Sequence, residues 1–283
     1  MGHVRRVRLK LHLTTMRGIM KDDAARSFDA EAELYDLMPS RRNHPDLELY
    51  LELAKQHGGP VLEFACGTGR VLIPCVEVAG EGVGVDLSTG MLDQARENAS
   101  KQGLSENAAQ FVQGDMENVR LGRTFPLVLM GGQPLFFLRT DEALRAALET
   151  VHVHLAPGGR FATAVPVPRM ATMMAERDRL KFVTEIRHPT TGSRQAVWNY
   201  SSFDEVTQVA IRRRIVETLD EDGVVTERQH SVQHIHYRHP AEMQRFIIDA
   251  GFRFEGLYGD YRRTPFGNGS EYLVWVARKV DDA

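Results

Sequence analysis

The stretch VLEFACGTGRVLIP, residues 61–74, decides the fold of this chain. Its apolar start predicts a buried strand, and Glu63 is the one charged residue within that strand. The strand runs into the small-residue bend Ala65-Cys66-Gly67-Thr68-Gly69, after which a helix begins. Small side chains let the backbone of a bend approach another group closely. We therefore expect a strand–turn–helix unit whose bend faces a ligand.

Strands and helices alternate along the sequence on both sides of this bend. Besides the first strand, strands are expected at 82–86, 109–115, 125–132 and 160–167, and helices at 46–57, 68–80, 89–103 and 141–159. The same rhythm resumes with a helix over 240–251 and strands over 252–261 and 270–279. Alternation of this kind predicts an α/β fold with a parallel sheet covered on both faces.

The alternation breaks between residues 168 and 238. From residue 180 onward, polar residues alternate with apolar or β-branched ones, and the turn clusters PTTG (189–192) and DEDG (220–223) divide the run. This pattern predicts an inserted antiparallel sheet with one solvated face. We thus expect one domain made of residues 22–167 and 239–283, with a helical lid at its N-terminal end, and an inserted β lid over 168–238.

Composition and charge exclude several classes of protein. The chain has 283 residues, 42% of them apolar and 26% charged, and its net charge is −3. Residues 1–21 hold six Lys or Arg and no acid, which leaves 29 basic against 38 acidic residues elsewhere. An acidic body argues against a nucleic-acid partner, and no apolar run approaches the ~20 residues of a membrane span. We expect a cytoplasmic protein whose basic leader, 1–21, is disordered, and two cysteines cannot build a disulfide framework.

The residues that end the expected strands carry the functional information, because ligands of open α/β sheets bind at the carboxyl ends of the strands. The second strand ends in Asp86, the third in Asp115 and the fourth in a segment that reaches Gln133. A carboxylate at the end of the second strand suits a ribose diol. A dinucleotide fingerprint would need a third glycine where Leu72 stands, and Glu63 would repel a pyrophosphate. Hydride transfer is therefore disfavoured.

The motifs resemble a known family. VLEFACGTGR, GVGVDLSTGMLDQAR, FVQGDMENV, FPLVLMGGQPLFFL and LAPGGRFATAV are similar, in order and spacing, to the successive motifs of class I S-adenosylmethionine-dependent methyltransferases. The resemblance extends over about residues 25–165 and again over 240–279. It implies a Rossmann-like, seven-stranded, mostly parallel sheet with an antiparallel last strand, and it implies S-adenosylmethionine as the cofactor.

The resemblance also implies roles for individual residues. The methionine part of the cofactor is expected against the bend, the ribose at Asp86, and the adenine between apolar side chains and Asp115. The expected cofactor-binding residues are Tyr35, Glu63, Ala65, Gly67, Gly69, Asp86, Leu87, Met91, Asp115, Met116, Met130 and Gln133. For Leu87, Met91 and Met116, plain core packing is an alternative, as is a helix cap for Asp115.

Catalytic residues are less well defined. Tyr35, within the YD pair of the N-terminal lid, is expected near the methyl group, although an amphipathic helix that buries it explains the pattern equally well. A hydroxyl acceptor would need a base, for which His236 or its neighbour Tyr237 is the candidate. His234 and His236 share a strand face, but without cysteines nearby we expect no metal site. Asp260 and Tyr261 are expected to face the pocket.

The predicted function is methyl transfer to a nitrogen or oxygen of a small molecule, of the kind that tailors amines, amino sugars or secondary metabolites. The segment GGQPLFF, 131–137, lacks the Asn/Asp-Pro-Pro-aromatic run typical of amino-methylation of adenine or glutamine. Two alternatives remain open: aminopropyl transfer on the same fold, and a non-catalytic module that binds the cofactor. A homo-oligomer also remains open.

Overall fold

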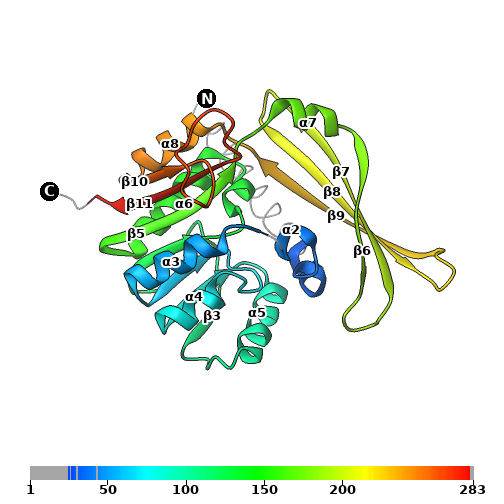
Figure 1. The fold of residues 1–283 in the computed structure, drawn as a ribbon, viewed down its shortest axis with the longest axis horizontal. Coiled ribbons are helices and arrows are strands. Elements are labelled where there is room, and N and C mark those ends of the chain that lie inside the picture. The colour runs from blue at the N-terminus through cyan, green and yellow to red at the C-terminus, as the bar shows by residue number, and fades with distance from the viewer. Residues whose placement is uncertain (1–24, 26, 30, 43, 281–283) are drawn as a thin grey trace, which may run out of the picture.

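A computed structural model describes residues 25, 27–29, 31–42 and 44–280, so the basic leader over 1–21 lies outside the described residues. Seven strands form one sheet in the order β10-β11-β5-β4-β1-β2-β3 (Figure 1). Strands β1 to β5 pair in parallel, whereas β11 pairs antiparallel with both β5 and β10. Four further strands form a separate antiparallel sheet in the order β6-β7-β8-β9. The expected fold class is confirmed.

The strands of the large sheet are β1 (Val61–Phe64), β2 (Gly82–Asp86), β3 (Ala109–Gln113), β4 (Phe125–Met130), β5 (Leu155–Pro166), β10 (Phe252–Tyr258) and β11 (Tyr272–Lys279). Its helices are α3 (Leu47–His57), α4 (Leu72–Ala79), α5 (Thr89–Lys101), α6 (Asp141–His154) and α8 (Pro240–Asp249), with the short helices α2 (Pro39–Arg42) and η1 (Pro134–Phe137). Each of α5 and α6 begins at a hydroxyl cap, because Ser88 and Thr140 accept the backbone N–H groups of Met91 and Ala143.

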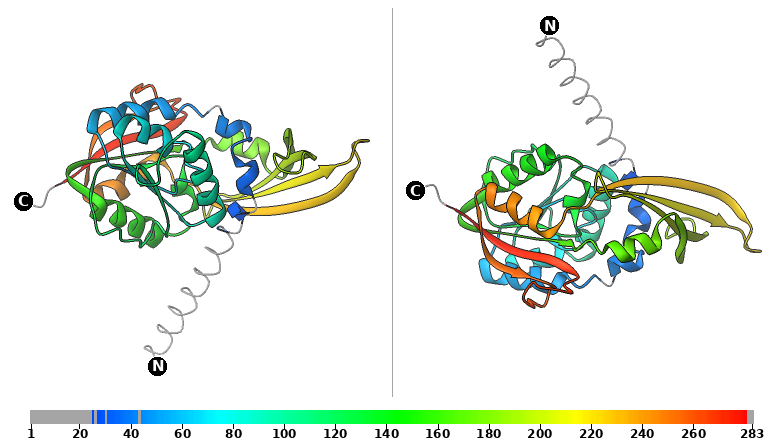
Figure 2. Two further views of the ribbon diagram at one scale, coloured as in Figure 1. Left: turned by 90° about the horizontal axis from the view of Figure 1, so that it is seen from below. Right: turned by 90° about the horizontal axis from the view of Figure 1, so that it is seen from above.

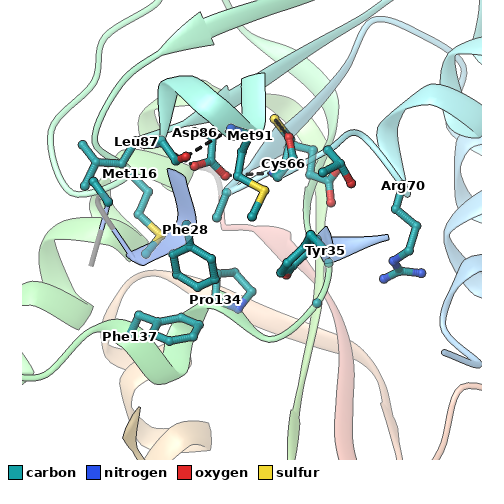
Figure 3. Close-up of a pocket in the computed structure, with 18 of the residues that line it drawn as sticks. Phe28, Tyr35, Cys66, Arg70, Asp86, Leu87, Met91, Met116, Pro134 and Phe137 are labelled. Carbon is teal, nitrogen blue, oxygen red and sulfur yellow. Dashed lines mark hydrogen bonds between the residues drawn. The ribbon is translucent and has the colours of Figure 1, made fainter. Parts of the chain in front are cut away.

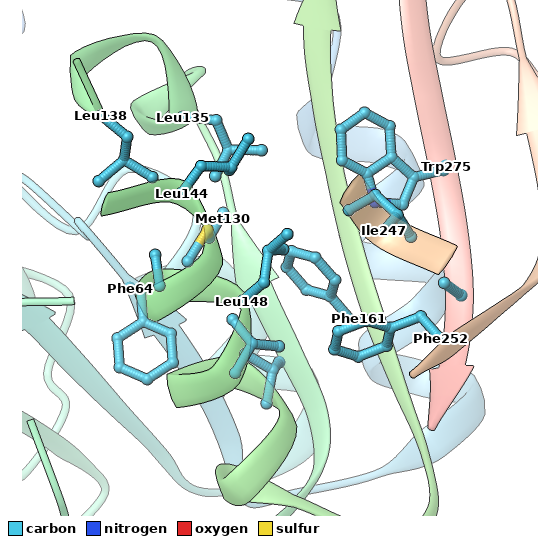
Figure 4. Close-up of a cluster of buried hydrophobic side chains, with 14 of the residues drawn as sticks. Phe64, Met130, Leu135, Leu138, Leu144, Leu148, Phe161, Ile247, Phe252 and Trp275 are labelled. Carbon is cyan, nitrogen blue, oxygen red and sulfur yellow. The ribbon is translucent and has the colours of Figure 1, made fainter. Parts of the chain in front are cut away.

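Two apolar cores hold the helices against the sheet. On one face, Phe64 and Phe161 from the strands pack with Leu148 of α6, Ile247 of α8 and the fully buried Trp275 (Figure 4). The second core contains Tyr50 and Leu53 of α3 and Leu72 and Val76 of α4, together with Leu127 of β4. Burial on both faces explains why the central strands β1, β2 and β4 are largely apolar and do not alternate. The sheet is thereby fixed as the rigid base on which the strand-end loops stand.

The inserted sheet consists of β6 (Arg179–Arg187), β7 (Arg194–Asp204), β8 (Val209–Leu219) and β9 (Val225–His236). Its long strands project away from the large sheet (Figure 2). A helix of seven residues, α7 (Met170–Glu176), precedes it and was not expected from the sequence. None of its residues is fully buried, but Met170 and Met173 pack against the apolar cluster around Tyr237, and the i, i+3 spacing of these methionines is a signal that could have found the helix.

Two expected helix boundaries were wrong by four residues or more, and the first is the start of the helix expected over 68–80, which begins only at Leu72. The helix expected over 141–159 ends at His154, and the Pro-Gly-Gly segment that follows belongs to β5. Leu155, fully buried, starts the strand by pairing with Phe125 of β4. Within the part of the chain that the structure describes, no helix is long and apolar enough to cross a membrane.

Candidate active site

The bend after β1 is shaped by three residues with positive φ. Ala65, Gly67 and Gly69 have φ angles of 52°, 54° and 80°. A Cβ on Gly69 would lie 2.7 Å from the Ile73 Cδ1 atom, so this glycine lets the bend pack on α4 and does not line a cavity. Gly69, expected to bind the cofactor, is thus not among the residues that line the cavity. Gly67 does line a cavity, and its backbone N–H donates to the Asp86 carboxylate at 2.8 Å.

The cavity lies where the resemblance places it, above the carboxyl ends of β1, β2 and β4, and encloses about 940 Å³ including its mouth (Figure 3). It brings together nine of the residues expected to bind a cofactor. These are Tyr35, Glu63, Ala65, Gly67, Asp86, Leu87, Met91, Asp115 and Met116. Met130 is not among them, and its side chain is fully buried in the core, but Gly131, the next residue of the backbone expected there, does line the cavity. Gln133 lines a neighbouring cavity instead.

Asp86 is held rigidly at the end of β2. One carboxylate oxygen accepts the Gly67 N–H and the other accepts the Ser88 N–H at 2.9 Å. Burial raises the pKa of the Asp86 carboxyl, and these backbone hydrogen bonds oppose the rise. A carboxylate oxygen has two lone pairs, so each still has capacity for a ligand hydroxyl.

Glu63 is a buried carboxyl at the floor of the same cavity. Its Oε2 atom has no hydrogen-bond partner, and a Cβ on Gly131 would lie 2.8 Å from its Oε1 atom. Burial raises its pKa to about 8, against the opposing effect of Arg70 and of two backbone hydrogen bonds. A buried polar atom without a partner is rare and marks a position where a ligand donor fits.

The N-terminal helix, described at residues 25, 27–29 and 31–35, covers this cavity. Its two aromatic side chains that line the cavity, Phe28 and Tyr35, are packed edge to face at 6.2 Å between ring centroids. We call this segment the lid helix. Tyr35 thus packs in a helix and also faces a cavity.

Two carboxylates attach the lid helix to the α/β domain. Asp29 accepts hydrogen bonds from Ser88 Oγ at 2.5 Å and from the Gly90 N–H at 2.9 Å, at the start of α5. Asp36 accepts from Thr68 Oγ1 at 2.6 Å and from Asn98 Nδ2 at 3.0 Å. The sequence analysis missed both, although their spacing of seven residues, two helical turns, is a signal that could have found them.

The other side of the lid helix holds the inserted sheet. Glu31, only 6% exposed, pairs with Arg214 of β8 at 2.5 Å and also accepts from Ser231 of β9. Leu34 packs with Val197 of β7 in a small apolar cluster. The lid helix therefore links the inserted sheet to the loops around the cavity.

A second cavity, of about 1640 Å³ including its open side, lies between the inserted sheet and the large sheet. It shares Phe28, Tyr35, Gly132 and Phe137 with the first cavity. Its remaining lining combines aromatic and aliphatic side chains with charged ones, namely Arg169, Arg212, Arg214, Glu176 and Glu271. Two adjoining cavities that meet at one wall suit two ligands that must touch.

Of the two residues expected as bases, only Tyr237 lines a cavity. His236 lines neither cavity, and its Nδ1 atom lies 2.9 Å from the Arg139 carbonyl oxygen. Burial lowers the pKa of this imidazole. Tyr237 does line the second cavity, but its hydroxyl donates to the Asp204 carbonyl at 3.3 Å. Neither side chain presents a basic atom to the junction of the cavities.

Asp260 and Tyr261 also differ from expectation, because neither lines a cavity. Asp260 closes its own turn by accepting from the N–H groups of Arg262 and Thr264. Tyr261 is buried, 5% exposed, behind the second cavity. In the described ranges, no group of three or more His, Cys, Asp or Glu side chains could hold a metal ion.

A buried polar cluster lies beside the first cavity, which its member Arg70 also lines. Asp46, with no exposed surface, receives both terminal nitrogens of Arg70 at 2.7 and 2.8 Å. The Nδ1 atom of His44 lies 2.9 Å from the same carboxylate. Burial raises the pKa of Asp46, but the contacts with His44 and Arg70 outweigh it and hold that pKa well below its ordinary value. No spacing in the sequence links Asp46 to Arg70, 24 residues away.

Comparison with known proteins agrees with this geometry. Residues 61–159, which span β1 to the start of β5, match the family model described as a methyltransferase domain. The structure superposes on the CcbJ methyltransferase of Streptomyces caelestis with a TM-score of 0.70 and 25% identity, over 89% of this chain and 96% of that one. The chain carries a class I, S-adenosylmethionine-dependent methyltransferase domain.

Among curated relatives, a dTDP-3-amino-3,4,6-trideoxy-alpha-D-glucopyranose N,N-dimethyltransferase of Streptomyces venezuelae is 37% identical over 99 residues. That alignment covers 35% of this chain and 39% of the relative, so the chain matches less than half of the relative's length. A putative methyltransferase of Bacillus subtilis, YqeM, is 29% identical over 88% of this chain and 95% of its own. S-adenosylmethionine is the cofactor of this methyltransferase domain.

The residues of the first cavity fit this cofactor chemically. The unpartnered Glu63 oxygen suits a cationic ammonium group, and Asp86 has acceptor capacity for hydroxyls. The small bend allows close approach, and the apolar side chains of Leu87, Met91 and Met116 suit an aromatic base. These acidic and apolar side chains match the cationic, hydroxyl-bearing and aromatic parts of S-adenosylmethionine.

Proposed function

We propose that this methyltransferase acts on a nitrogen or oxygen of a small molecule that enters through the second cavity. The observation that carries the proposal is the shared wall of the two cavities, which would bring an acceptor against a cofactor held in the first. The names of the relatives from Streptomyces venezuelae and Streptomyces fradiae, both N,N-dimethyltransferases of dTDP-amino sugars, support a small amine acceptor.

When bound, S-adenosylmethionine supplies a methyl group that an acceptor lone pair takes as the carbon–sulfur bond breaks. The chain's own contribution is alignment and exclusion of water. Glu63 and Asp86 would fix the two ends of the cofactor, and Ala65 and Gly67 would admit its chain. Phe28 and Phe137, packed edge to face at 5.3 Å, would close the junction against solvent.

The primary test is calorimetry followed by an acceptor screen. We expect the purified protein to bind S-adenosylmethionine and its demethylated product. We also expect methyl transfer to dTDP-3-amino-3,6-dideoxyglucose or another member of a panel of amino sugars, amines and phenols, detected by mass spectrometry. Binding without turnover of any member would favour the non-catalytic alternative. Transfer of an aminopropyl group from decarboxylated cofactor would replace the proposal with the other alternative.

The lid helix gives a kinetic prediction. Replacing Asp36 with alanine removes the acceptor for Thr68 and Asn98 and leaves the lid helix attached to α5 through Asp29 alone. Loss of two hydrogen bonds worth about 1 kcal/mol each should speed cofactor dissociation by roughly tenfold or more. Stopped-flow fluorescence with a displacing excess of product measures this rate. Glu97→Ala, an exposed neighbour of Asn98, is the control, and an unchanged rate in Asp36→Ala would show that the lid helix does not retain the cofactor.

A further inference from the structure

Gln133 sits at the edge of the second cavity in an unusual backbone conformation. It follows β4, lines the cavity next to the shared Gly132, and has a φ of 70° although it is not glycine. A non-glycine residue in the left-handed region is held there by its surroundings, and such positions gather at functional sites. The Gln133 side chain can turn either its carbonyl oxygen or its NH₂ group toward the cavity.

His44 and Asp46 determine the orientation of the Gln133 amide. The Nδ1 atom of His44 lies 2.9 Å from an oxygen of Asp46, and the paired Arg70 guanidinium keeps that carboxylate ionised. A lone pair on Nδ1 would be repelled by this negative charge, so the hydrogen of the imidazole is on Nδ1. In a neutral imidazole the other nitrogen, Nε2, then has a lone pair and can only accept.

The Gln133 amide must therefore offer its NH₂ group to His44. The two side chains meet at 3.3 Å between the amide Nε2 and the imidazole Nε2. This contact draws the nitrogen end of the amide into the buried cluster and leaves the oxygen end for the cavity that Gln133 lines.

We propose that the Gln133 amide oxygen faces the second cavity and orients the acceptor by taking a hydrogen bond from its N–H or O–H group, with His44 and Asp46 as positioning residues that prevent the amide from turning over. This inference rests on the proposed function. It narrows the acceptor to a nitrogen or oxygen that still bears a hydrogen, such as a primary or secondary amine. A primary amine should accept at most two methyl groups, since a tertiary amine has no N–H to offer while its lone pair is free.

The hydrogen position on His44 can be measured without an acceptor. Long-range ¹⁵N–¹H spectra of protein labelled at histidine distinguish the two neutral tautomers, and the His44 signals are assigned by their loss in His44→Gln. We expect the tautomer with hydrogen on Nδ1 at pH 8. Hydrogen on Nε2 would overturn the proposal, because the Gln133 amide would then turn its oxygen to His44.

Two substitutions at His44 separate positioning from simple packing. Glutamine places a polar atom where Nε2 stands and can accept from Gln133, whereas asparagine reaches only the Nδ1 position beside Asp46. With dTDP-3-amino-3,6-dideoxyglucose as acceptor, His44→Asn should lose about tenfold or more in kcat/KM with a raised acceptor KM. His44→Gln should stay within a few-fold of wild type. Equal losses in both variants, or none in His44→Asn, would overturn the proposal.

A second pair of variants keeps the proposal testable if His44→Asn does not fold. Gln133→Met keeps the length of the side chain without its polar atoms and should raise the acceptor KM, with cofactor affinity unchanged. His57→Gln, on the last turn of α3 and outside both cavities, is the matched control. An unchanged acceptor KM in Gln133→Met would refute this inference alone, whereas absence of cofactor binding in the wild type would refute the proposed function.

Discussion

Replacing Asp86 with alanine is expected to weaken S-adenosylmethionine binding by about a hundredfold. The residue ends β2 and lines the cavity, and its two carboxylate oxygens are held by the N–H groups of Gly67 and Ser88. Two hydrogen bonds from ligand hydroxyls to a carboxylate are worth about 1.5 kcal/mol or more each, which gives the expected factor. Calorimetric titration of the variant with S-adenosylmethionine measures it directly.

The same substitution also releases two backbone N–H groups, so a control for folding is needed. Asp86→Asn keeps one acceptor oxygen and should fall between alanine and wild type. Asp93→Asn, an exposed carboxylate on α5 that pairs only with Arg96 among the contacts seen, should bind as the wild type does. If Asp86→Ala melts like the wild type and binds the cofactor with unchanged affinity, Asp86 has no part in the cofactor site.

The second large expected effect is the release of a proton from Glu63 when the cofactor binds. Burial raises the pKa of this carboxyl to about 8, so at pH 7 it is mostly protonated in the ligand-free protein. An ammonium group at its unpartnered oxygen favours the ionised form, and binding should then release close to one proton at pH 7. Affinity should rise by up to about tenfold from pH 6 to pH 7, below the range in which an α-amino group itself loses its proton.

Calorimetry at pH 7 in two buffers of different ionisation enthalpy gives the number of protons released. Glu63→Gln cannot release a proton, so its binding enthalpy should not depend on the buffer and its affinity should be flat between pH 6 and pH 7. Glu77→Gln, exposed on α4, is the matched control. Buffer-independent binding in the wild type would show that Glu63 does not meet the cation of the cofactor.

Because its pKa is raised on folding, Glu63 also makes the stability of the protein depend on pH. A carboxyl whose pKa rises from 4.5 to about 8 on folding contributes most below pH 4.5, and its contribution is lost as the pH rises toward 8. Each unit within this window costs up to about 1.4 kcal/mol of the free energy of unfolding. Glu63→Gln should therefore melt above the wild type at pH 8 and differ little at pH 5, without cofactor present.

The contrast between Asp86 and His236 shows how far the sequence could predict the site. Asp86 was found because the end of a parallel strand always points to the same edge of the sheet, so its place in the pattern fixes its place in space. His236 was misplaced because a residue of an antiparallel strand can face either side. The decisive contact, with the Arg139 carbonyl, joins residues 97 apart in the chain. One step along a strand exchanges the cavity for the core, and for this reason the Met130 side chain is buried while its neighbour Gly131 lines the cavity.

The sequence by itself determined what depends on local order: the alternation that makes the α/β sheet, the small-residue bend after β1, and the carboxylates that end β2 and follow β3. Those features need only strand direction and backbone freedom, which neighbouring residues set. The tertiary structure alone decided which distant side chains meet, such as Glu31 with Arg214, 183 residues apart, and His44 with Gln133, 89 apart. Such pairs form because two sheets and a lid helix pack around one pair of cavities, and no local pattern encodes that packing.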